Sequence, residues 1–192
     1  MKRIFFAVKI EPGKFLTEVV QTFQLSLNDE KIKWTVPDNY HITLAFLGDT
    51  EEGKIQILGD LAEKSCAGSG EFDFFLRGAG VFRSPKEPRV IWVGIQESEK
   101  LIQLAELVNS AVKMSGINIE EKSFRPHLTI GRLKRLQSQD ILKSLLKKYE
   151  DTEIQVILVK EVILFESITK PTGPFYSALR KFRVSQGSFL TI

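Results

Sequence analysis

The chain of 192 residues is poor in the residue types that build disulfides and metal clusters. It has a single cysteine, Cys66, and two histidines. One thiol forms neither an internal disulfide nor a thiolate cluster for zinc, and two imidazoles alone are too few ligands for a closed zinc site. We therefore expect Cys66 to be a small, partly buried side chain and the protein to work in a reducing, cytoplasmic setting.

Long apolar runs are also missing. The run that follows Arg3 ends at Lys9, and it is shorter than the roughly 7–15 residues of a signal-peptide core. Nothing elsewhere approaches the ~20 apolar residues that a membrane-spanning helix needs. No low-complexity segment or flexible linker interrupts the sequence. We expect a mature, soluble protein with no membrane partner, in which residues 1–192 form a single domain.

A glycine-rich phosphate loop is absent as well. Gly78, Ala79 and Gly80 lie between two runs of strand-forming residues, where a glycine pair predicts a bulge or a bend and not a nucleotide cradle.

Neither sign of charge is in large excess, since 27 Lys and Arg face 24 Asp and Glu. The distribution is uneven: residues 121–150 contain eight basic and three acidic residues, a net charge of +5, whereas residues 41–70 contain two Lys and five acids. We expect one electropositive face that attracts an anionic substrate. We interpret Lys143, Lys147 and Lys148 as the solvated face of a helix.

Strand-like and helix-like segments alternate along the chain. Strands are predicted over residues 3–10, 31–36, 41–47, 71–83, 89–96, 117–120, 127–132, 153–167 and 175–184, of which 153–167 is either one long strand or a strand with a bend. Helices are predicted from Pro12 to near Asn28, from Thr50 to about Lys64, from Leu101 to Ser115, and over residues 139–149 after a capping Ser138. Several hairpin-like connections favour an α+β fold in which helices pack against mainly antiparallel sheets.

One short motif occurs twice. Residues 41–47 read HITLAFL and residues 127–133 read HLTIGRL. Each starts with one of the two histidines, places Thr two residues later and ends on Leu. Thr fills ten of the 192 positions, so this recurrence would arise by chance in roughly one chain in 400. We interpret the two motifs as one structural unit used twice.

The repeated residue types suit phosphodiester chemistry. Alternate residues of a strand share a face, so His41 lies beside Thr43 and His127 beside Thr129. If the strands meet about a pseudo-twofold axis, one cleft holds two imidazoles and two hydroxyls. An imidazole with a pKa near 6.5 can accept a proton while a second one donates. The hydroxyls can bind non-bridging phosphate oxygens, and Arg132 adds a planar cation.

Further segments complete the pattern around the two motifs. They are residues 3–8, Trp34, residues 88–94, residues 124–126, residues 165–167 and residues 173–176. With the two His-x-Thr strands, this set resembles the two-histidine phosphoesterase superfamily, and within it the bacterial and archaeal RNA 2′,3′-cyclic phosphodiesterases, which are also known as 2′-5′ RNA ligases of the LigT type.

This resemblance implies both a fold and a reaction. The fold is a bilobal α+β domain, with two mainly antiparallel sheets facing across a cleft, helices on the outside and an internal pseudo-twofold. The reaction opens an RNA 2′,3′-cyclic phosphate to a 2′-phosphate with no metal and no cofactor, and a 5′ hydroxyl in place of water would give a 2′-5′ linkage. The implied partner is RNA with such an end, tRNA among the candidates, and the implied state is a monomer.

By the same resemblance we assign His127 as the general base and His41 as the general acid on the 3′ oxygen. A pseudo-symmetric site also permits the reverse order, and this alternative stays open here. Thr43, Thr129 and Arg132 would bind the phosphate, while metal ligands are not expected. Phe46 is either a surface for stacking on a base or a core residue. Trp34 and Tyr40 are weaker stacking candidates that we expect to pack in the core.

Two other functions stay open at this point. One is hydrolysis of a small cyclic nucleotide, which a comparison of cyclic mononucleotides with cyclic-phosphate-ended oligonucleotides would separate. The other is a non-catalytic RNA-binding module, for which two intact His-x-Thr pairs are unnecessary because binding needs cations and aromatic side chains.

Overall fold

Two antiparallel β-sheets organise the protein, as shown by a computed structural model that describes residues 1–83, 87–96, 98–119, 123–171 and 173–184. The four-stranded sheet has the order β3-β1-β8-β9 and consists of β1 (Lys2–Lys9), β3 (His41–Thr50), β8 (Glu161–Lys170) and β9 (Gly173–Arg183). The five-stranded sheet has the order β2-β6-β5-β4-β7 and consists of β2 (Lys31–Trp34), β4 (Phe72–Phe82), β5 (Val90–Ile95), β6 (Leu128–Arg135) and β7 (Glu153–Val159).

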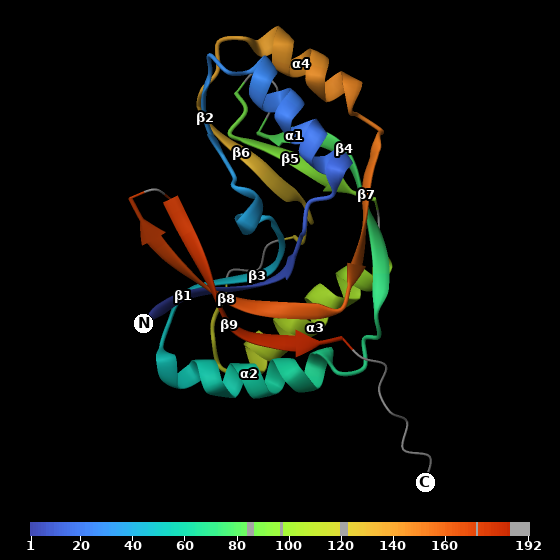
Figure 1. Cartoon of the computed structure of the whole chain (residues 1–192). Helices are drawn as coiled ribbons and strands as arrows, with labels where there is room; N and C mark the ends of the chain where they lie inside the picture. The colour runs from blue at the N-terminus through green and yellow to red at the C-terminus, as the bar shows by residue number, and fades with distance from the viewer. Residues whose placement is uncertain (84–86, 97, 120–122, 172, 185–192) are drawn as a thin grey trace.

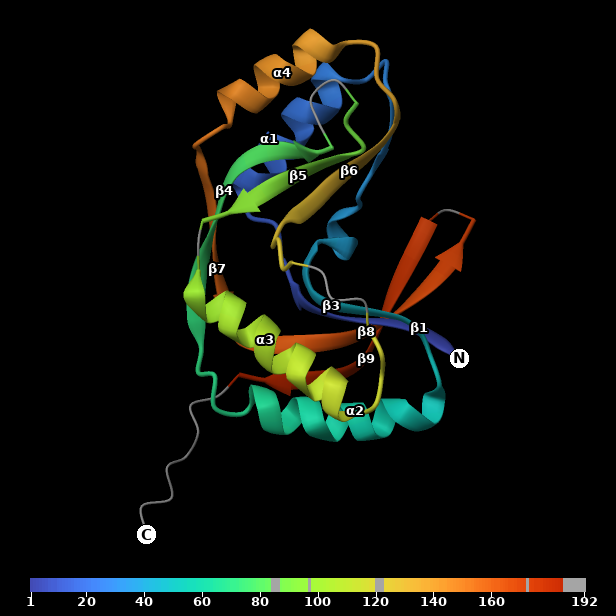
Figure 2. The ribbon, with the colours of Figure 1, turned by 180° about the vertical axis from the view of Figure 1, so that it is seen from behind.

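Each sheet has its own pair of helices. Helices α2 (Glu52–Cys66) and α3 (Glu99–Met114) pack on each other and against β9 and β3, and we name this unit the four-stranded lobe. Helices α1 (Lys14–Ser26) and α4 (Gln139–Lys148) contact β7 and β4 and complete the five-stranded lobe. Figures 1 and 2 show the helix pairs at opposite ends of the molecule with both sheets between them. The expected bilobal α+β architecture is therefore confirmed.

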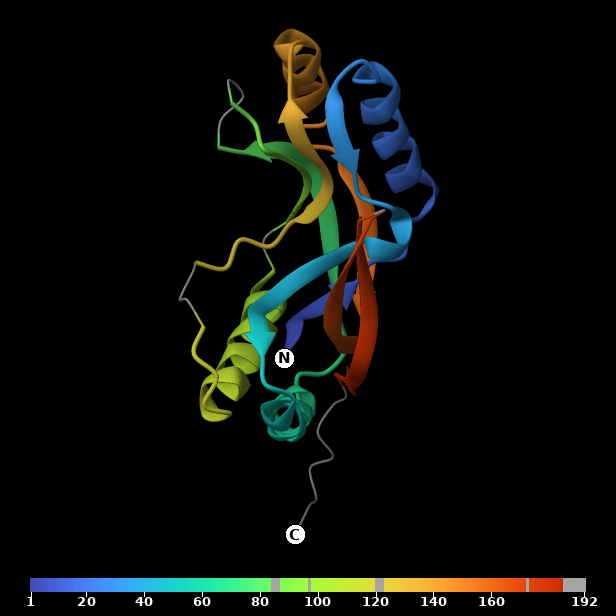
Figure 3. The same ribbon diagram turned by 90° about the vertical axis from the view of Figure 1, so that its left-hand side faces the viewer.

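The chain passes between the lobes several times, so neither lobe is a continuous segment. One crossing corrects a sequence prediction: residues 153–167, predicted as a long strand or a strand with a bend, form two strands in different sheets. Strand β7 ends at Val159 in the five-stranded sheet, and β8 begins at Glu161 in the other, after Lys160 has turned the chain. The reason is the change of partner, since β7 pairs with β4 whereas β8 pairs with β1 and β9. Figure 1 shows the crossing from β7 to β8, and Figure 3 shows the two lobes from the side.

Other boundaries differ by a few residues. Strand β3 extends through Thr50, so α2 begins at Glu52 and not at Thr50. Strand β6 begins at Leu128, opposite Val93, where its ladder with β5 starts, so His127 lies just outside the strand. Residues 117–119 form no strand, which makes that prediction wrong for the part of 117–120 that the structure describes.

The apolar helix faces that the sequence periodicity predicts are buried in the structure. In α3 the apolar residues that recur at helical spacing are at most 1% exposed, namely Leu101, Leu104, Ala105, Val108 and Val112. Burial of such side chains is worth roughly 1.5–3 kcal/mol for each large one, so these faces hold the helices on the sheets. Cys66 is fully buried, more deeply than expected, and this burial raises the pKa of its thiol to about 11. It is therefore a core residue and not a reactive thiolate.

The bend expected at Gly78 and Gly80 is present. The register of β4 against β5 shifts between Leu76 and Ala79, and Gly78 has a φ of +74°. A Cβ at Gly78 would lie 2.7 Å from the backbone oxygen of Glu150. Glycine is thus required both by the left-handed backbone and by the close approach of the chain after α4.

We predict that Gly78→Ala lowers the free energy of unfolding by roughly 1–3 kcal/mol, because a side chain there is strained and collides with backbone. Gly53→Ala is the matched control. Gly53 lies in α2, where a Cβ would meet no neighbouring atom within 4 Å, so alanine should raise stability by up to about 1 kcal/mol. Urea unfolding curves measure both. A Gly78→Ala variant as stable as the parent would contradict the conclusion that glycine is required at position 78.

Candidate active site

The two His-x-Thr motifs meet where the lobes face each other. Strand β3 is an edge strand of the four-stranded sheet, β6 lies inside the five-stranded sheet, and the two are in contact. His41 is the first residue of β3, and His127 immediately precedes β6. The alternation follows the prediction, because Ile42 and Leu128 are fully buried while both histidines and Thr129 are half-buried. The buried alternate residues therefore fix which side chains face the cleft.

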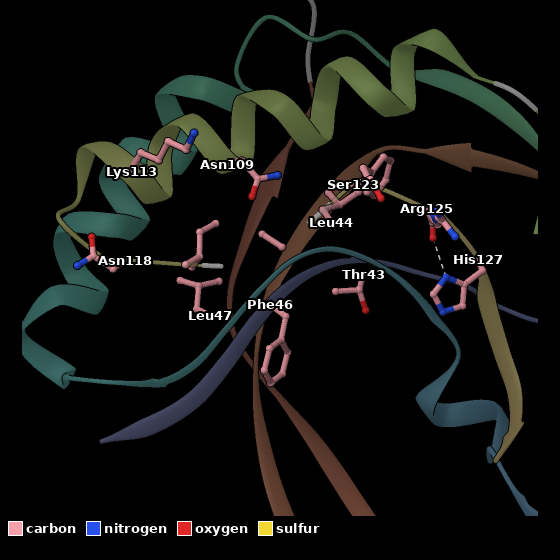
Figure 4. Close-up of a pocket in the computed structure, with 13 residues that line it drawn as sticks. Thr43, Leu44, Phe46, Leu47, Asn109, Lys113, Asn118, Ser123, Arg125 and His127 are labelled. Atoms are coloured by element: carbon pink, nitrogen blue, oxygen red, sulfur yellow. Dashed lines mark hydrogen bonds between the residues drawn. The ribbon is translucent and has the colours of Figure 1, made fainter. Parts of the chain in front are cut away.

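Both imidazoles are held in the same way. His41 Nδ1 lies 2.7 Å from the backbone oxygen of Asn39, and His127 Nδ1 lies 2.7 Å from that of Arg125. A carbonyl oxygen only accepts hydrogen bonds, so Nδ1 is the donor in each ring. The second nitrogen, Nε2, is left to take or give a proton. Figure 4 shows the bond at His127 as a dashed line beside the pocket.

Aromatic rings enclose the two histidines. The His41 ring lies 5.0 Å from Phe5 and packs edge-on against Tyr176 at 5.2 Å, measured between centroids. The His127 ring packs edge-on against Phe82 at 4.6 Å. These contacts remove water from one side of each imidazole and fix the orientation that the Nδ1 hydrogen bond sets.

The surroundings lower the pKa of both histidines. Burial is the largest cause for each, and the hydrogen bond to the carbonyl of Asn39 or Arg125 opposes it. The positive charge of Arg132 lowers both pKa values further, and His41 also feels Lys9 and His127. The lowered pKa values favour the neutral form of both imidazoles in the free protein. An anion bound between them would raise both pKa values again.

Two pockets adjoin the histidines, and each takes residues from both motifs. Pocket 1, of about 710 Å³, is lined by Thr43 of the first motif and His127 of the second. Pocket 2, of about 440 Å³, is lined by His41 of the first motif with Thr129 and Arg132 of the second. The structure thus brings together all five residues that the sequence singled out for acid–base and phosphate chemistry. Each pocket is therefore lined by residues of both motifs.

Phe46 lines pocket 1 and is 51% exposed, so its interpretation as a core residue is wrong. The guanidinium of Arg3 lies 4.9 Å from the centroid of its ring. Tyr40 is 3% exposed and belongs to the core, as expected, whereas Trp34 is partly buried and lines pocket 2. Figure 4 shows Phe46 and Thr43 projecting from the same strand.

The basic residues of 121–150 divide between the site and the surface. Arg125 lines pocket 1 and Arg132 lines pocket 2. Lys143 and Lys147 lie on the exposed face of α4 and pair with Asp140 and the nearby Glu150, as the solvated-face interpretation predicts. Within residues 121–150, the positive charge that lines the pockets therefore comes from Arg125 and Arg132.

Sequence reasoning missed the neighbours that orient the histidines. The carbonyls of Asn39 and Arg125 each belong to the residue two positions before a histidine, and this equal spacing is a signal that the repeat contained. Phe82 had no local signal, because it reaches the site from a strand distant in sequence. Tyr176 lies in residues 173–176, which belong to the family pattern, but the sequence did not indicate its contact with His41.

Within the described residues, no group of three or more His, Cys, Asp or Glu side chains is arranged to hold a metal ion. No helix in the described part of the chain is long and apolar enough to cross a membrane.

The fold and the site define a two-lobed α+β protein with one histidine from each lobe beside a shared cleft. A sequence model described as the 2′-5′ RNA ligase superfamily matches residues 17–167. The chain belongs to this superfamily, which confirms the resemblance noted in the sequence.

Curated relatives and solved structures agree with this family. An RNA 2′,3′-cyclic phosphodiesterase of Methanothermobacter thermautotrophicus is 33% identical over 184 residues, covering 95% of this chain and 98% of the relative. One of Aquifex aeolicus is 35% identical over 187 residues, covering 95% and 98%. The structure of Escherichia coli LigT complexed with 3′-AMP is similar with a TM-score of 0.75 and 27% identity, covering 96% of this chain and 99% of LigT.

We predict that both histidines titrate with midpoints below 6.5, because burial and Arg132 disfavour their charged forms. The chain has two histidines, so two sets of imidazole signals in NMR spectra report them. Arg132→Gln should raise both midpoints, since it removes a positive charge that lowers both. Lys134→Gln, which removes an exposed charge elsewhere on β6, should move neither. Midpoints at or above 6.5, or an Arg132→Gln variant with unchanged midpoints, would contradict this electrostatic account.

Proposed function

We propose that this protein hydrolyses the 2′,3′-cyclic phosphate at the 3′ end of an RNA to a 2′-phosphate, using His41 and His127 as an acid–base pair and no metal ion. The observation that carries the proposal is the pair of imidazoles in one cleft, each with Nδ1 bonded to a carbonyl and Nε2 available. The names of the curated relatives support the same substrate class. Two imidazoles can supply both proton transfers that the reaction requires.

In the proposed reaction, the oxygen of a water molecule attacks phosphorus opposite the 3′ oxygen. Nε2 of His127 takes the proton of this water as the new P–O bond forms. The bond between phosphorus and the 3′ oxygen breaks, and Nε2–H of His41 donates its proton to that oxygen. The products are a 3′ hydroxyl and a 2′-phosphate. Exchange of protons with solvent then returns both histidines to their starting states.

The acid needs a proton that the free protein does not favour. The pKa of His41 is lowered mainly by burial, and Lys9 and Arg132 add to this. A bound cyclic phosphate carries one negative charge, which stabilises a protonated His41 and raises its pKa when the substrate is in place. In this proposal, binding of the substrate therefore favours protonation of His41. Consequently, kcat should hold to a higher pH than kcat/KM, since kcat/KM reports the free enzyme.

Phosphate binding is assigned to Thr43, Thr129 and Arg132. The two hydroxyls come from opposite lobes and can each donate to a different non-bridging oxygen, where charge develops in the transition state. Arg132 is exposed within pocket 2 and adds a planar donor next to His41. Phe46 offers an exposed ring in pocket 1 on which the terminal base can stack.

The same site accounts for ligation without a nucleotide cofactor. If a 5′ hydroxyl occupies the position of water, the attack produces a 2′-5′ phosphodiester and no other bond has to be activated. The direction then depends on whether water or the hydroxyl of a second RNA reaches phosphorus.

The test uses an oligoribonucleotide with a 2′,3′-cyclic phosphate end, incubated with the protein in EDTA. We expect complete conversion to a 2′-phosphate, identified by its 31P signal against authentic 2′- and 3′-phosphate standards. His41→Ala and His127→Ala should each lower kcat/KM by about 10²–10⁴-fold. Lys134→Ala serves as the control for loss of a surface side chain. A 3′-phosphate product, or activity only after a metal is added, would overturn the proposal.

A further inference from the structure

Pocket 2 contains groups that the proposed reaction does not use. The tip of the β8–β9 hairpin extends from the four-stranded sheet toward the other lobe (Figure 1). There Asn39 Nδ2 donates a 2.8 Å hydrogen bond to the backbone oxygen of Pro174. A Cβ on Gly173 would lie 3.0 Å from Nζ of Lys33 on β2. The hairpin therefore forms one wall of the pocket and β2 the other.

These two walls are basic and aromatic. Lys33 comes from β2 and Lys170 from β8, and both line the pocket with exposed side chains. The ring of Phe175 is 46% exposed, and Nζ of Lys170 lies 3.9 Å from its centroid. One carboxylate, that of Asp38, also lines the pocket. Cations beside an exposed ring are the features that bind the backbone and the base of single-stranded RNA.

The position of pocket 2 relative to the reacting phosphate suggests which part of the RNA it receives. On the terminal ribose, the phosphate is attached at the 2′ and 3′ oxygens, and the base and C5′ diverge on either side of the ring oxygen. With the phosphate between His41 and His127 and the base directed to Phe46 in pocket 1, C5′ points away from pocket 1. The chain that continues from C5′ then leads to pocket 2.

We propose that pocket 2 is a binding subsite for the nucleotide that precedes the cyclic-phosphate end. Lys33 and Lys170 bind the phosphodiester that joins it to the terminal nucleotide, and its base stacks on Phe175. This inference rests on the proposed function for the orientation of the terminal nucleotide. With this subsite the protein binds an RNA end more tightly than a mononucleotide, because a mononucleotide fills the reacting centre and pocket 1 only.

Binding of three product-like ligands tests the subsite without turnover. The first is a nucleoside 2′-phosphate, and the second is the same unit extended by one nucleotide on its 5′ side. In the third, a 2′-5′-linked dinucleoside, the added nucleoside is joined to the reacting phosphate instead. We expect the 5′ extension to tighten binding by roughly tenfold, measured by calorimetry, and the third ligand to gain little.

Three substitutions test which side chains produce this gain in affinity. Lys33→Ala, Lys170→Ala and Phe175→Leu should each reduce the affinity ratio of the 5′-extended ligand to the mononucleotide by at least about threefold. Lys100→Ala, which removes an exposed charge that lines neither pocket, should leave the ratio as in the parent. Replacing the internal phosphodiester by a neutral methylphosphonate should reduce the ratio in the parent and have little further effect in the double variant Lys33→Ala/Lys170→Ala, which lacks both cations.

The outcomes separate this inference from the proposed function. A parent protein that hydrolyses cyclic phosphate ends but shows no gain from the 5′ extension overturns the subsite alone. A gain for the 2′-5′-linked ligand that these variants abolish would mean that pocket 2 receives the acceptor strand, and the inference would be wrong. A gain lost in the three variants supports the subsite even if no hydrolysis is detected, in which case the proposed function fails by itself.

Discussion

The hydrogen bond from each histidine Nδ1 to the carbonyl two residues earlier is the constraint on which the site depends. It fixes the proton on Nδ1 and directs Nε2 to the cleft in both halves. Packing of Phe5 and Tyr176 on one ring and of Phe82 on the other makes this orientation rigid. The same packing removes water and lowers the pKa values of both histidines. An anion bound between the rings would raise these pKa values and favour a protonated imidazole.

The interleaved chain explains how two imidazoles from different lobes come to lie beside one cleft. Neither sheet is built from a continuous segment, and the strands β3 and β6 meet across the lobes. Any motion that separates the lobes would therefore part the proposed acid from the proposed base. The contact of Asn39 with Pro174 ties the β8–β9 hairpin to the segment that carries the carbonyl partner of His41. The proposed binding of RNA in pocket 2 and the orientation of His41 would thus involve the same small region.

The sequence was sufficient to predict most helices and strands and the residues of the repeat. It was insufficient to predict which side chains surround the two histidines. Alternation on β3 and β6 and the 3.6-residue periodicity of α3 are local, so Ile42, Leu128 and Leu104 could be placed in the core directly. The division of 153–167 into two strands was not local, because it depends on which sheet each half pairs with. The ring contacts of Phe82 and Tyr176 with the histidines were missed for the same reason. The choice between a surface and a core position for Phe46 also depended on the tertiary structure.

The division of labour between the two imidazoles is the central claim, and a substrate with sulfur in place of the 3′ oxygen tests it most directly. A thiolate leaves with little help from an acid, whereas attack by water still needs a base. The account predicts that His41→Ala recovers most of its lost rate on this substrate relative to the oxygen substrate, while His127→Ala recovers none. Recovery of His127→Ala instead, or of neither variant, would contradict the assignment of His41 as the acid.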